Sequence, residues 1–194
     1  MEEVEAIYGR EVVEALQRLD AKFKDRYGVT ALHIAAKLNM VDHVRKLLEL
    51  GADPNTADDF CQTPLHFAAE TCSTEAAEIL LEKGADPNAE DVYGRSPLEL
   101  AVFYRCVDMV KEMLPRAKPS LGVLLAAVGD PHMLSLVLNT WSDIVKVYGG
   151  EAVLAAIERG ALQGAALLIG LGVDPNYVSS RGAALHIAAQ RCLP

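Results

Sequence analysis

The feature of this 194-residue chain that most constrains its fold is a heptapeptide that recurs at one fixed interval. TALHIAA begins at Thr30, TPLHFAA begins 33 residues later at Thr63, and SPLELAV begins another 33 residues later at Ser96. A related heptapeptide, AALHIAA, begins at Ala183. Because a repeat period of roughly 20 to 50 residues is typical of stacked supersecondary units, we expect a repeat fold rather than a single globular core.

Each copy carries signals for two helices and a turn. Thr30, Thr63 and Ser96 are predicted N-caps, and Pro64 and Pro97 suit the first position of a helix, where a missing N–H has no consequence. The heptapeptide gives that helix an apolar side, and a second apolar run at helical spacing follows it. The motif Gly-Ala-Asp-Pro-Asn then supplies a glycine that ends the second helix and a turn that leads to the next cap.

This arrangement resembles the ankyrin repeat family, whose unit of about 33 residues has a Thr-Pro-Leu-His-x-Ala core, a β-turn and two helices. The resemblance implies an all-α fold, a solenoid of helix-turn-helix units with β-hairpin or turn connections. Residues 1–27 fit an N-terminal helical cap, and we expect the repeats after it to form one continuous domain. The predicted repeats are 28–60, 61–93, 94–118, 119–148, 149–181 and the partial copy 182–194.

Two middle repeats, 94–118 and 119–148, are degraded. Pro115 and Pro119 bracket the segment PRAKP, where a Gly-Ala-Asp-Pro-Asn turn should stand. We therefore expect a shortened connection at this segment and a gap in the row of hairpins. The N-terminal cap is expected to face the first repeat with Val4, Ile7, Val12, Val13, Leu16 and Leu19.

Charge and apolar content limit the classes of partner. The formal net charge is −9, and residues 1–114 hold 12 Lys and Arg against 22 Asp and Glu. Nucleic acids and anionic membranes bind concentrated Lys and Arg, so we predict neither as a partner. The longest apolar stretches fall short of the roughly 20 residues that span a bilayer, and the acidic start lacks the layout of a secretory signal. We therefore predict a cytoplasmic protein.

The cysteines show neither metal-type pairing nor a tight disulfide framework. We expect them to be reduced and mainly buried thiols; a disulfide is the alternative if the source is a hyperthermophile. They are Cys61, Cys72, Cys106 and Cys192.

Three histidines share one position of the repeat and are unsuited to joint metal binding. In stacked helices His33, His66 and His186 would lie about 10 Å apart per repeat, whereas zinc ligands each lie about 2 Å from the ion. The family resemblance instead implies that this histidine supports the turn through hydrogen bonds. No nucleophile, base and orienting residue occur together. We therefore predict that the chain is not an enzyme, has no catalytic residue and binds neither a metal nor a cofactor. An enzyme with a site in the irregular residues 94–150 is the weakest alternative.

The resemblance implies a non-catalytic protein-protein interaction module that binds a protein or peptide partner in a concave groove, through hairpin tips and the exposed side of the first helices. The hairpin position three residues before each helix start is aromatic in four repeats: Tyr27, Phe60, Tyr93 and, counted back from Glu151, Tyr148. Either these rings pack between hairpins and stiffen them, or they form an aromatic row in the groove, where tyrosine is a favoured hot-spot residue. Phe103 and Tyr104 on a first helix would add the largest apolar patch.

Further candidate contacts flank these rings in the hairpins and on the first helices. They are Arg26, Lys37, Leu38, Asp59, Gln62, Glu70 and Arg95. Because the acidic excess lies on the same repeats, we predict a partner with a basic rim around apolar anchors.

Self-association is a further alternative. The last copy supplies one helix without a partner helix, and terminal repeats need a polar outer face for solubility. Leu185, Ile187 and Leu193 would lack a cover, which would favour a homodimer through the incomplete C-terminal repeat. The competing interpretation is that the sequence is a fragment of a longer protein or that its end frays.

Overall fold

The computed structural model describes residues 2–179, 182 and 183 of the chain. The chain divides into two compact units, Met1–Ala117 and Lys118–Pro194. Both units are built from α-helices, and the second also has one antiparallel pair of short strands. The predicted all-α fold of helix pairs is confirmed, whereas the repeat boundaries and their grouping into one domain stay predictions.

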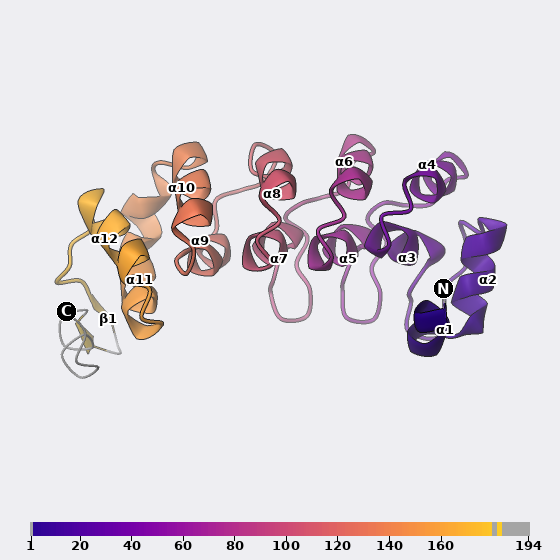
Figure 1. Cartoon of the computed structure of the whole chain (residues 1–194), viewed down its shortest axis with the longest axis horizontal. Coiled ribbons are helices and arrows are strands. Elements are labelled where there is room, and N and C mark those ends of the chain that lie inside the picture. Colours follow the sequence, from indigo (N-terminus) through magenta and orange to yellow (C-terminus); the bar gives the residue numbers. More distant parts are fainter. Residues whose placement is uncertain (1, 180–181, 184–194) are drawn as a thin grey trace. The chain divides into compact units, whose positions relative to one another are not determined.

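The first unit consists of a helical cap and three helix pairs (Figure 1). The cap contains α1 (Glu2–Tyr8) and α2 (Arg10–Arg18). The pairs are α3 (Ala31–Lys37) with α4 (Val41–Glu49), α5 (Pro64–Glu70) with α6 (Thr74–Glu82), and α7 (Pro97–Phe103) with α8 (Val107–Met113). The first helices α3, α5 and α7 lie in one row, and the second helices α4, α6 and α8 lie in another.

The first helices begin at the predicted caps. Thr30 Oγ1 accepts a hydrogen bond from the backbone N–H of His33 at 3.4 Å, and Ser96 Oγ accepts one from the N–H of Glu99 at 3.1 Å. Pro64 occupies the first turn of α5. Because a side-chain cap stabilises a helix by about 1 kcal/mol, even these short helices start at well-defined residues.

Small and branched apolar side chains fill the space between the helices of the first unit. Ala35, Ala68 and Ala101 on the first helices are fully buried, and their size lets α3, α5 and α7 approach closely. Leu47 and Leu80 on the second helices are also fully buried, and burying a leucine contributes about 1.5–3 kcal/mol. Each pair thus covers the apolar face of its neighbour.

The cap covers the first pair with α2 rather than with α1. Val12 and Leu16 of α2 are buried, but Ile7 of α1 is 72% exposed. The prediction that Ile7 faces the first repeat is therefore wrong. Gly9, with φ of 88°, follows α1 and redirects the chain, so the two cap helices do not share one apolar face. The side chain of Val4 lies outside the described part of the chain.

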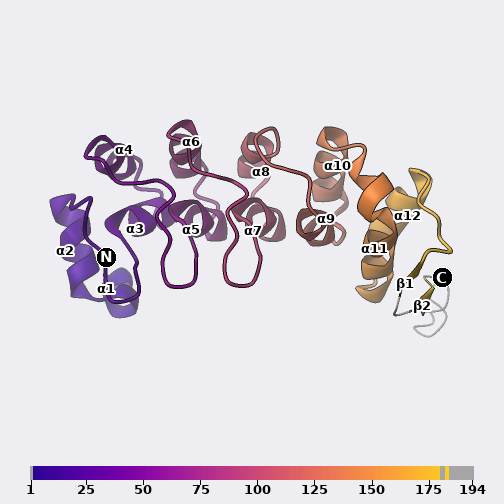
Figure 2. The ribbon, with the colours of Figure 1, turned by 180° about the vertical axis from the view of Figure 1, so that it is seen from behind.

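Connections between the helix pairs have two lengths. Residues 50–63 join α4 to α5, and residues 83–96 join α6 to α7. Both segments extend as long loops beside the first helices (Figure 2). Residues 114–120, which join α8 to α9, are half as many, and this confirms the short connection predicted at PRAKP.

In its described residues, the second unit contains four helices and one antiparallel pair of short strands. The helices are α9 (Leu121–Ala127), α10 (Pro131–Thr140), α11 (Ile144–Glu158) and α12 (Leu162–Gly170). Strands β1 (Val178–Ser179) and β2 (Gly182–Ala183) pair antiparallel, with Val178 opposite Ala183. Asp130 caps α10, because its Oδ1 accepts the backbone N–H of His132 at 2.9 Å.

Helix α11 replaces a hairpin that we predicted from the sequence. It runs without interruption through residues 148–150, the expected turn between the fourth and fifth repeats. A Cβ at Gly149 would lie 2.7 Å from Val173 Cγ2, and a Cβ at Gly150 would overlap the ring of Tyr177. The two glycines make room for the segment after α12 instead of forming a turn, so the predicted hairpin is wrong.

Candidate partner-binding site

Three loops of the first unit share one hydrogen-bonded turn. In each loop an aspartate Oδ1 accepts hydrogen bonds of 2.8–2.9 Å from the backbone N–H groups two and four residues later. The aspartates are Asp25, Asp58 and Asp91. Because an aromatic residue follows each aspartate by two positions, the turn fixes the backbone of Tyr27, Phe60 and Tyr93.

Backbone hydrogen bonds also join the three loops to one another. The N–H of Asp59 donates to the carbonyl of Tyr27 at 2.9 Å, and the N–H of Val92 donates to the carbonyl of Phe60 at 3.0 Å. The two longer loops lie side by side in both views of the ribbon (Figures 1 and 2). Tyr27, Phe60 and Tyr93 therefore occupy equivalent positions of neighbouring loops, and we call these three residues the aromatic row.

The rings of the aromatic row face solvent. Tyr27 is 48% exposed, Phe60 52% and Tyr93 73%. The guanidinium of Arg26 lies 4.7 Å from the ring centroid of Tyr27, and that of Arg95 lies 4.9 Å from the centroid of Tyr93, distances typical of cation–π contacts. Backbone hydrogen bonds, rather than rings buried between hairpins, hold the loops together.

A second aromatic cluster lies at the end of α7. Phe103 is 67% exposed and Tyr104 47% exposed, and their rings contact edge to face with centroids 5.2 Å apart.

At the equivalent turns of α3 and α5, Lys37 Nζ donates to Glu70 Oε2 at 3.0 Å. Burial alone would lower the pKa of Lys37, but the hydrogen bond to Glu70 raises it above its usual value. Leu38, which follows Lys37, is also exposed.

Buried histidines support the loops. His33 Nδ1 accepts the N–H of Thr30 at 3.1 Å, and Nε2 donates to the carbonyl of Gln62 in the next loop at 3.0 Å. His66 acts in the same way one repeat later, with Nε2 donating to the carbonyl of Arg95 at 3.1 Å. Burial lowers the pKa of His33 to about 4, so the imidazole is neutral near pH 7. Both histidines have the structural role that the family resemblance implied.

The second and third loops have the same geometry but different electrostatics. Burial raises the pKa of Asp58 above its usual value. Burial acts in the same direction on Asp91, but hydrogen bonds from Arg95 outweigh it and lower the pKa of Asp91. Arg95 donates to Asp91 Oδ2 from Nε at 2.9 Å and from Nη2 at 2.7 Å. Gln62 holds the position equivalent to Arg95, so the second loop lacks this guanidinium.

The predicted contact residues of the first unit all lie in the hairpin loops or at the ends of first helices. Tyr148 does not, because it lies within α11 and is half-buried. The prediction of a fourth ring at a hairpin tip is therefore wrong: the segment is part of one helix, in which Gly149 and Gly150 leave room for Val173 and Tyr177. The following residues, discussed above for their repeat position or for self-association, lie outside the described residues: Leu185, His186, Ile187 and Leu193.

A disulfide bond joins Cys72 to Cys106, which corrects the expectation that the cysteines are reduced thiols. Cys72 follows α5 and Cys106 precedes α8, so the bond connects neighbouring helix pairs, with Cα atoms 5.1 Å apart. The two cysteines are 34 residues apart, one more than the repeat period, so the stacking of successive repeats brings them close together. This spacing was the signal in the sequence. Cys61 is free and exposed rather than buried, and Cys192 lies outside the described residues.

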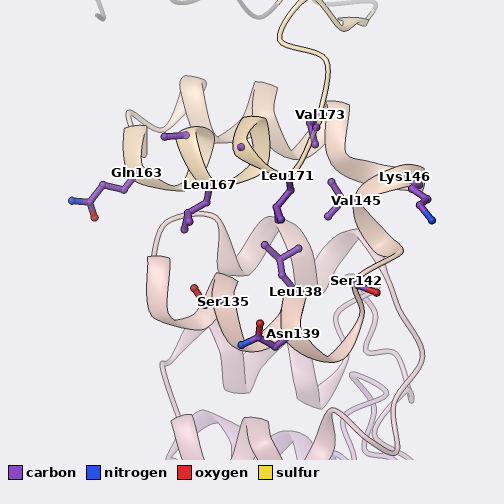
Figure 3. Close-up of a pocket in the computed structure, with 13 residues that line it drawn as sticks. Ser135, Leu138, Asn139, Ser142, Val145, Lys146, Gln163, Leu167, Leu171 and Val173 are labelled. Carbon is purple, nitrogen blue, oxygen red and sulfur yellow. The ribbon is translucent and has the colours of Figure 1, made fainter.

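The second unit has a cavity that we did not predict from the sequence (Figure 3). It measures about 980 Å³ and lies between α10, the first turn of α11 and α12. Leu138, Leu167 and Leu171 point into it. Polar side chains also line it: Ser135, Asn139, Ser142, Lys146 and Gln163. Because three helices contribute these residues, no local sequence pattern indicates the cavity.

The described residues offer no metal site. Among positions 2–179, 182 and 183, no group of three or more His, Cys, Asp or Glu side chains could hold a metal ion. No helix in this part of the chain is long and apolar enough to cross a membrane. Burial lowers the pKa of His33, and both ring nitrogens of this histidine hydrogen-bond to backbone groups, so its shifted pKa goes with a structural role.

Comparison with known proteins finds similar sequences and a similar fold. A family model described as ankyrin repeats (3 copies) matches residues 56–122, and one described as ankyrin repeats (many copies) matches residues 23–68. Among solved structures, the chain is similar to the ankyrin repeat domain of Bcl-3, described as a unique member of the IkappaB protein family. The two chains are 24% identical, with a TM-score of 0.76 over 95% of this chain and 92% of that chain. No curated protein matches the chain.

Proposed function

Because the chain belongs to the ankyrin repeat family, we propose that it is a non-catalytic module that binds a protein or peptide partner on its hairpin loops and first helices. Ankyrin repeats generally mediate protein–protein interactions. The observation that carries the proposal is the aromatic row, three exposed rings on loops that hydrogen-bond to one another. We place this function in the cytoplasm as part of the same proposal.

The structure of the loops favours binding through the aromatic row. Binding costs free energy when side chains and loops must be ordered, and loops that are already hydrogen-bonded reduce that cost. Tyrosine and phenylalanine then offer large contact areas with few rotatable bonds. Phe103 and Tyr104 add a second pair of exposed rings at the end of α7.

We further propose that the partner has a basic rim around apolar anchors. Residues 1–114 hold 12 Lys and Arg against 22 Asp and Glu. Lys37 pairs with Glu70 and Arg95 pairs with Asp91, and each pair neutralises one carboxylate with one cation, so these pairs leave the acidic excess of this part of the chain unchanged. Charge complementarity chiefly raises the association rate, whereas contacts with the rings chiefly slow dissociation.

The first test compares the proteins that wild-type chain and variants capture from a lysate of the source organism. Tyr93→Ala and Phe103→Ala should each deplete the specific partner, because truncating a central aromatic anchor costs about 2 kcal/mol, roughly thirtyfold in affinity. Glu49→Ala and Glu82→Ala, on exposed positions of α4 and α6, are matched surface controls and should retain it. Quantitative mass spectrometry identifies proteins that follow this pattern.

The second test measures binding kinetics with the partner so identified. Tyr93→Ala and Phe103→Ala should accelerate dissociation, and added salt should mainly slow association. Binding that Glu49→Ala or Glu82→Ala abolished, while folded ring variants bound as tightly as wild type, would place the interface elsewhere.

A further inference from the structure

The disulfide between Cys72 and Cys106 occupies a junction between helix pairs whose counterpart, one repeat earlier, is held by hydrogen bonds. In that earlier junction, Thr71 Oγ1 donates to the carbonyl of Lys37 at 2.7 Å. Ser73 Oγ donates to the same carbonyl at 3.0 Å. Two hydroxyl groups in the loop between α5 and α6 thus bind the end of α3.

Asn39, in the loop between α3 and α4, also takes part in this junction. We call the contacts of Asn39, Thr71 and Ser73 the polar junction. Asn39 Nδ2 donates to Glu75 Oε2 at 2.6 Å, and Asn39 Oδ1 accepts the backbone N–H of Ala76 at 3.0 Å. Side chains from both loops therefore fasten the first helix pair to the second.

A shift of one 33-residue period maps the polar junction onto the next pair of repeats. Asn39 corresponds to Cys72, and Ser73 corresponds to Cys106. Thr71 corresponds to Tyr104. The disulfide therefore joins the two positions that an amide and a hydroxyl hold in the polar junction, and a covalent bond stands where the preceding repeats use hydrogen bonds.

The backbone near this disulfide adopts unfavourable conformations. Cys72 has φ of 53° and Arg105 has φ of 62°, left-handed values that crowd a residue with a Cβ. Asn39 holds the equivalent position in the first repeat, with φ of 51°, and asparagine tolerates this region better. Such conformations persist only where the surroundings enforce them, and the bond from Cys106 to Cys72 is a contact with the second repeat next to Arg105.

We propose that Cys72 and Cys106 form a reversible thiol–disulfide site that fastens the third helix pair to the second and orders the loop between α7 and α8, next to Phe103 and Tyr104. The oxidised state holds the loop, and the reduced state frees it. These rings belong to the surface proposed above to bind a partner, but the redox site is a property of the chain alone. Failure of partner binding would therefore leave this inference standing.

The two cysteine residues differ in exposure, which sets the course of reduction. Cys72 is exposed and Cys106 is 4% exposed, so a small thiolate such as that of glutathione attacks Sγ of Cys72. The bond between the two Sγ atoms breaks, Cys106 leaves as a thiolate and takes a proton, and Cys72 forms a mixed disulfide. A second glutathione thiolate attacks the glutathione sulfur, which releases oxidised glutathione and a Cys72 thiolate that takes the second proton. Two glutathione thiols are oxidised while one protein disulfide is reduced.

The compartment decides which state prevails. Cytoplasmic thiols are mostly kept reduced, and cytosolic disulfides are usually transient. In the cytoplasm the site would rest as a dithiol and close under oxidation.

A redox titration tests reversibility. The full chain carrying Cys61→Ser and Cys192→Ser is equilibrated with mixtures of reduced and oxidised glutathione, trapped by alkylation and analysed by peptide mass spectrometry. Cys72 and Cys106 should convert together between the bonded and the alkylated form as the mixture changes. A pair that stayed alkylated in excess oxidised glutathione, or bonded in excess reduced glutathione, would overturn the proposal.

Hydrogen exchange tests the ordering of the loop. Amides of residues 103–110 should exchange about tenfold or more slowly in the oxidised chain than in the reduced chain, because a disulfide restricts local opening. Amides of residues 38–43, at the polar junction, are the internal control and should exchange equally in both states. Equal exchange at residues 103–110 in the two states would overturn the proposal.

A matched variant rebuilds the polar junction in the redox-sensitive position. Cys72→Asn combined with Tyr104→Thr and Cys106→Ser supplies the residues of the preceding junction. Exchange at residues 103–110 should then be independent of glutathione. Protection that still followed the glutathione mixture in this variant would assign the effect to another group and overturn the proposal.

Discussion

His33 and Gln62 are joined by a hydrogen bond of 3.0 Å from the imidazole Nε2 to the backbone carbonyl, across 29 residues of sequence. A side chain of the first repeat thereby fixes the loop of the second repeat, two residues beyond Phe60. His66 and Arg95 have the same relationship at 3.1 Å. The position of the exposed rings therefore depends on buried, neutral imidazoles.

The free energy of unfolding should fall as the pH falls from about 6.5 to about 4. Burial lowers the folded-state pKa of His33 from 6.5 to about 4, so in this window the unfolded chain binds a proton that the folded chain does not. The contribution of neutral His33 is complete above pH 6.5, and up to about 3 kcal/mol of it is lost by pH 4. Urea unfolding followed by circular dichroism across this range measures the loss.

Variants separate His33 from other groups that titrate in this window. His33→Asn removes the titrating ring, so its unfolding free energy should depend less on pH, whatever its absolute stability. His132→Asn removes an exposed histidine of α10 and should keep the wild-type dependence. If the unfolding free energy of His33→Asn depended on pH as steeply as that of wild type, protonation of this imidazole would not be the cause of the loss of stability in acid.

Gly164→Ala should destabilise the second unit by about 1–3 kcal/mol, the usual cost of overpacking. A Cβ at Gly164 of α12 would overlap the backbone carbonyl oxygen of Val128, which cannot rotate away as a flexible side chain could. Gly170→Ala is the matched control, because a Cβ there meets nothing within 4 Å. Trp141, the single tryptophan, is buried in this unit, and its fluorescence reports thermal unfolding. Equal midpoints for the two variants would contradict this close approach.

Local sequence motifs were sufficient to predict the helix pairs and turns of the first unit. Thr30 and His33 lie three residues apart and hydrogen-bond to each other directly, so their roles follow from a short stretch of chain. The period of the motif also predicted that Tyr27, Phe60 and Tyr93 hold equivalent positions, because repeated turns place them alike.

Contacts between distant elements could not be predicted in this way. Tyr148 has the spacing of a hairpin residue, but its segment belongs to α11, where Gly149 leaves room for Val173 from the segment after α12. Cys72 and Cys106 become neighbours only because repeats stack with a particular register. The cavity of the second unit likewise needs three helices in place before its lining residues meet.

Gln62 and Arg95 hold equivalent positions in neighbouring loops, and substituting each by the other should reverse the pKa shifts of the adjacent aspartates. Gln62→Arg should place a guanidinium beside Asp58 and lower its raised pKa. Arg95→Gln should remove both hydrogen bonds to Asp91 Oδ2 and let burial raise the pKa of that carboxyl. Carbon-13 NMR titration of the two side chains measures both changes.

The same substitutions should change stability in opposite directions. The folded-state pKa of Asp91 is lowered, which stabilises the fold above the ordinary pKa of the carboxyl, and this stabilisation is lost as the pH falls through the folded-state pKa. The folded-state pKa of Asp58 is raised, so the fold loses stability as the pH rises and this carboxyl ionises. Gln62→Arg should therefore raise the urea midpoint at pH 7, and Arg95→Gln should lower it. Gln62→Lys controls for charge alone and should lower the pKa of Asp58 less, because an ammonium cannot reproduce the planar, bidentate pairing of arginine. A pKa of Asp58 that stayed raised in Gln62→Arg would show that the two loops do not position residue 62 and residue 95 alike.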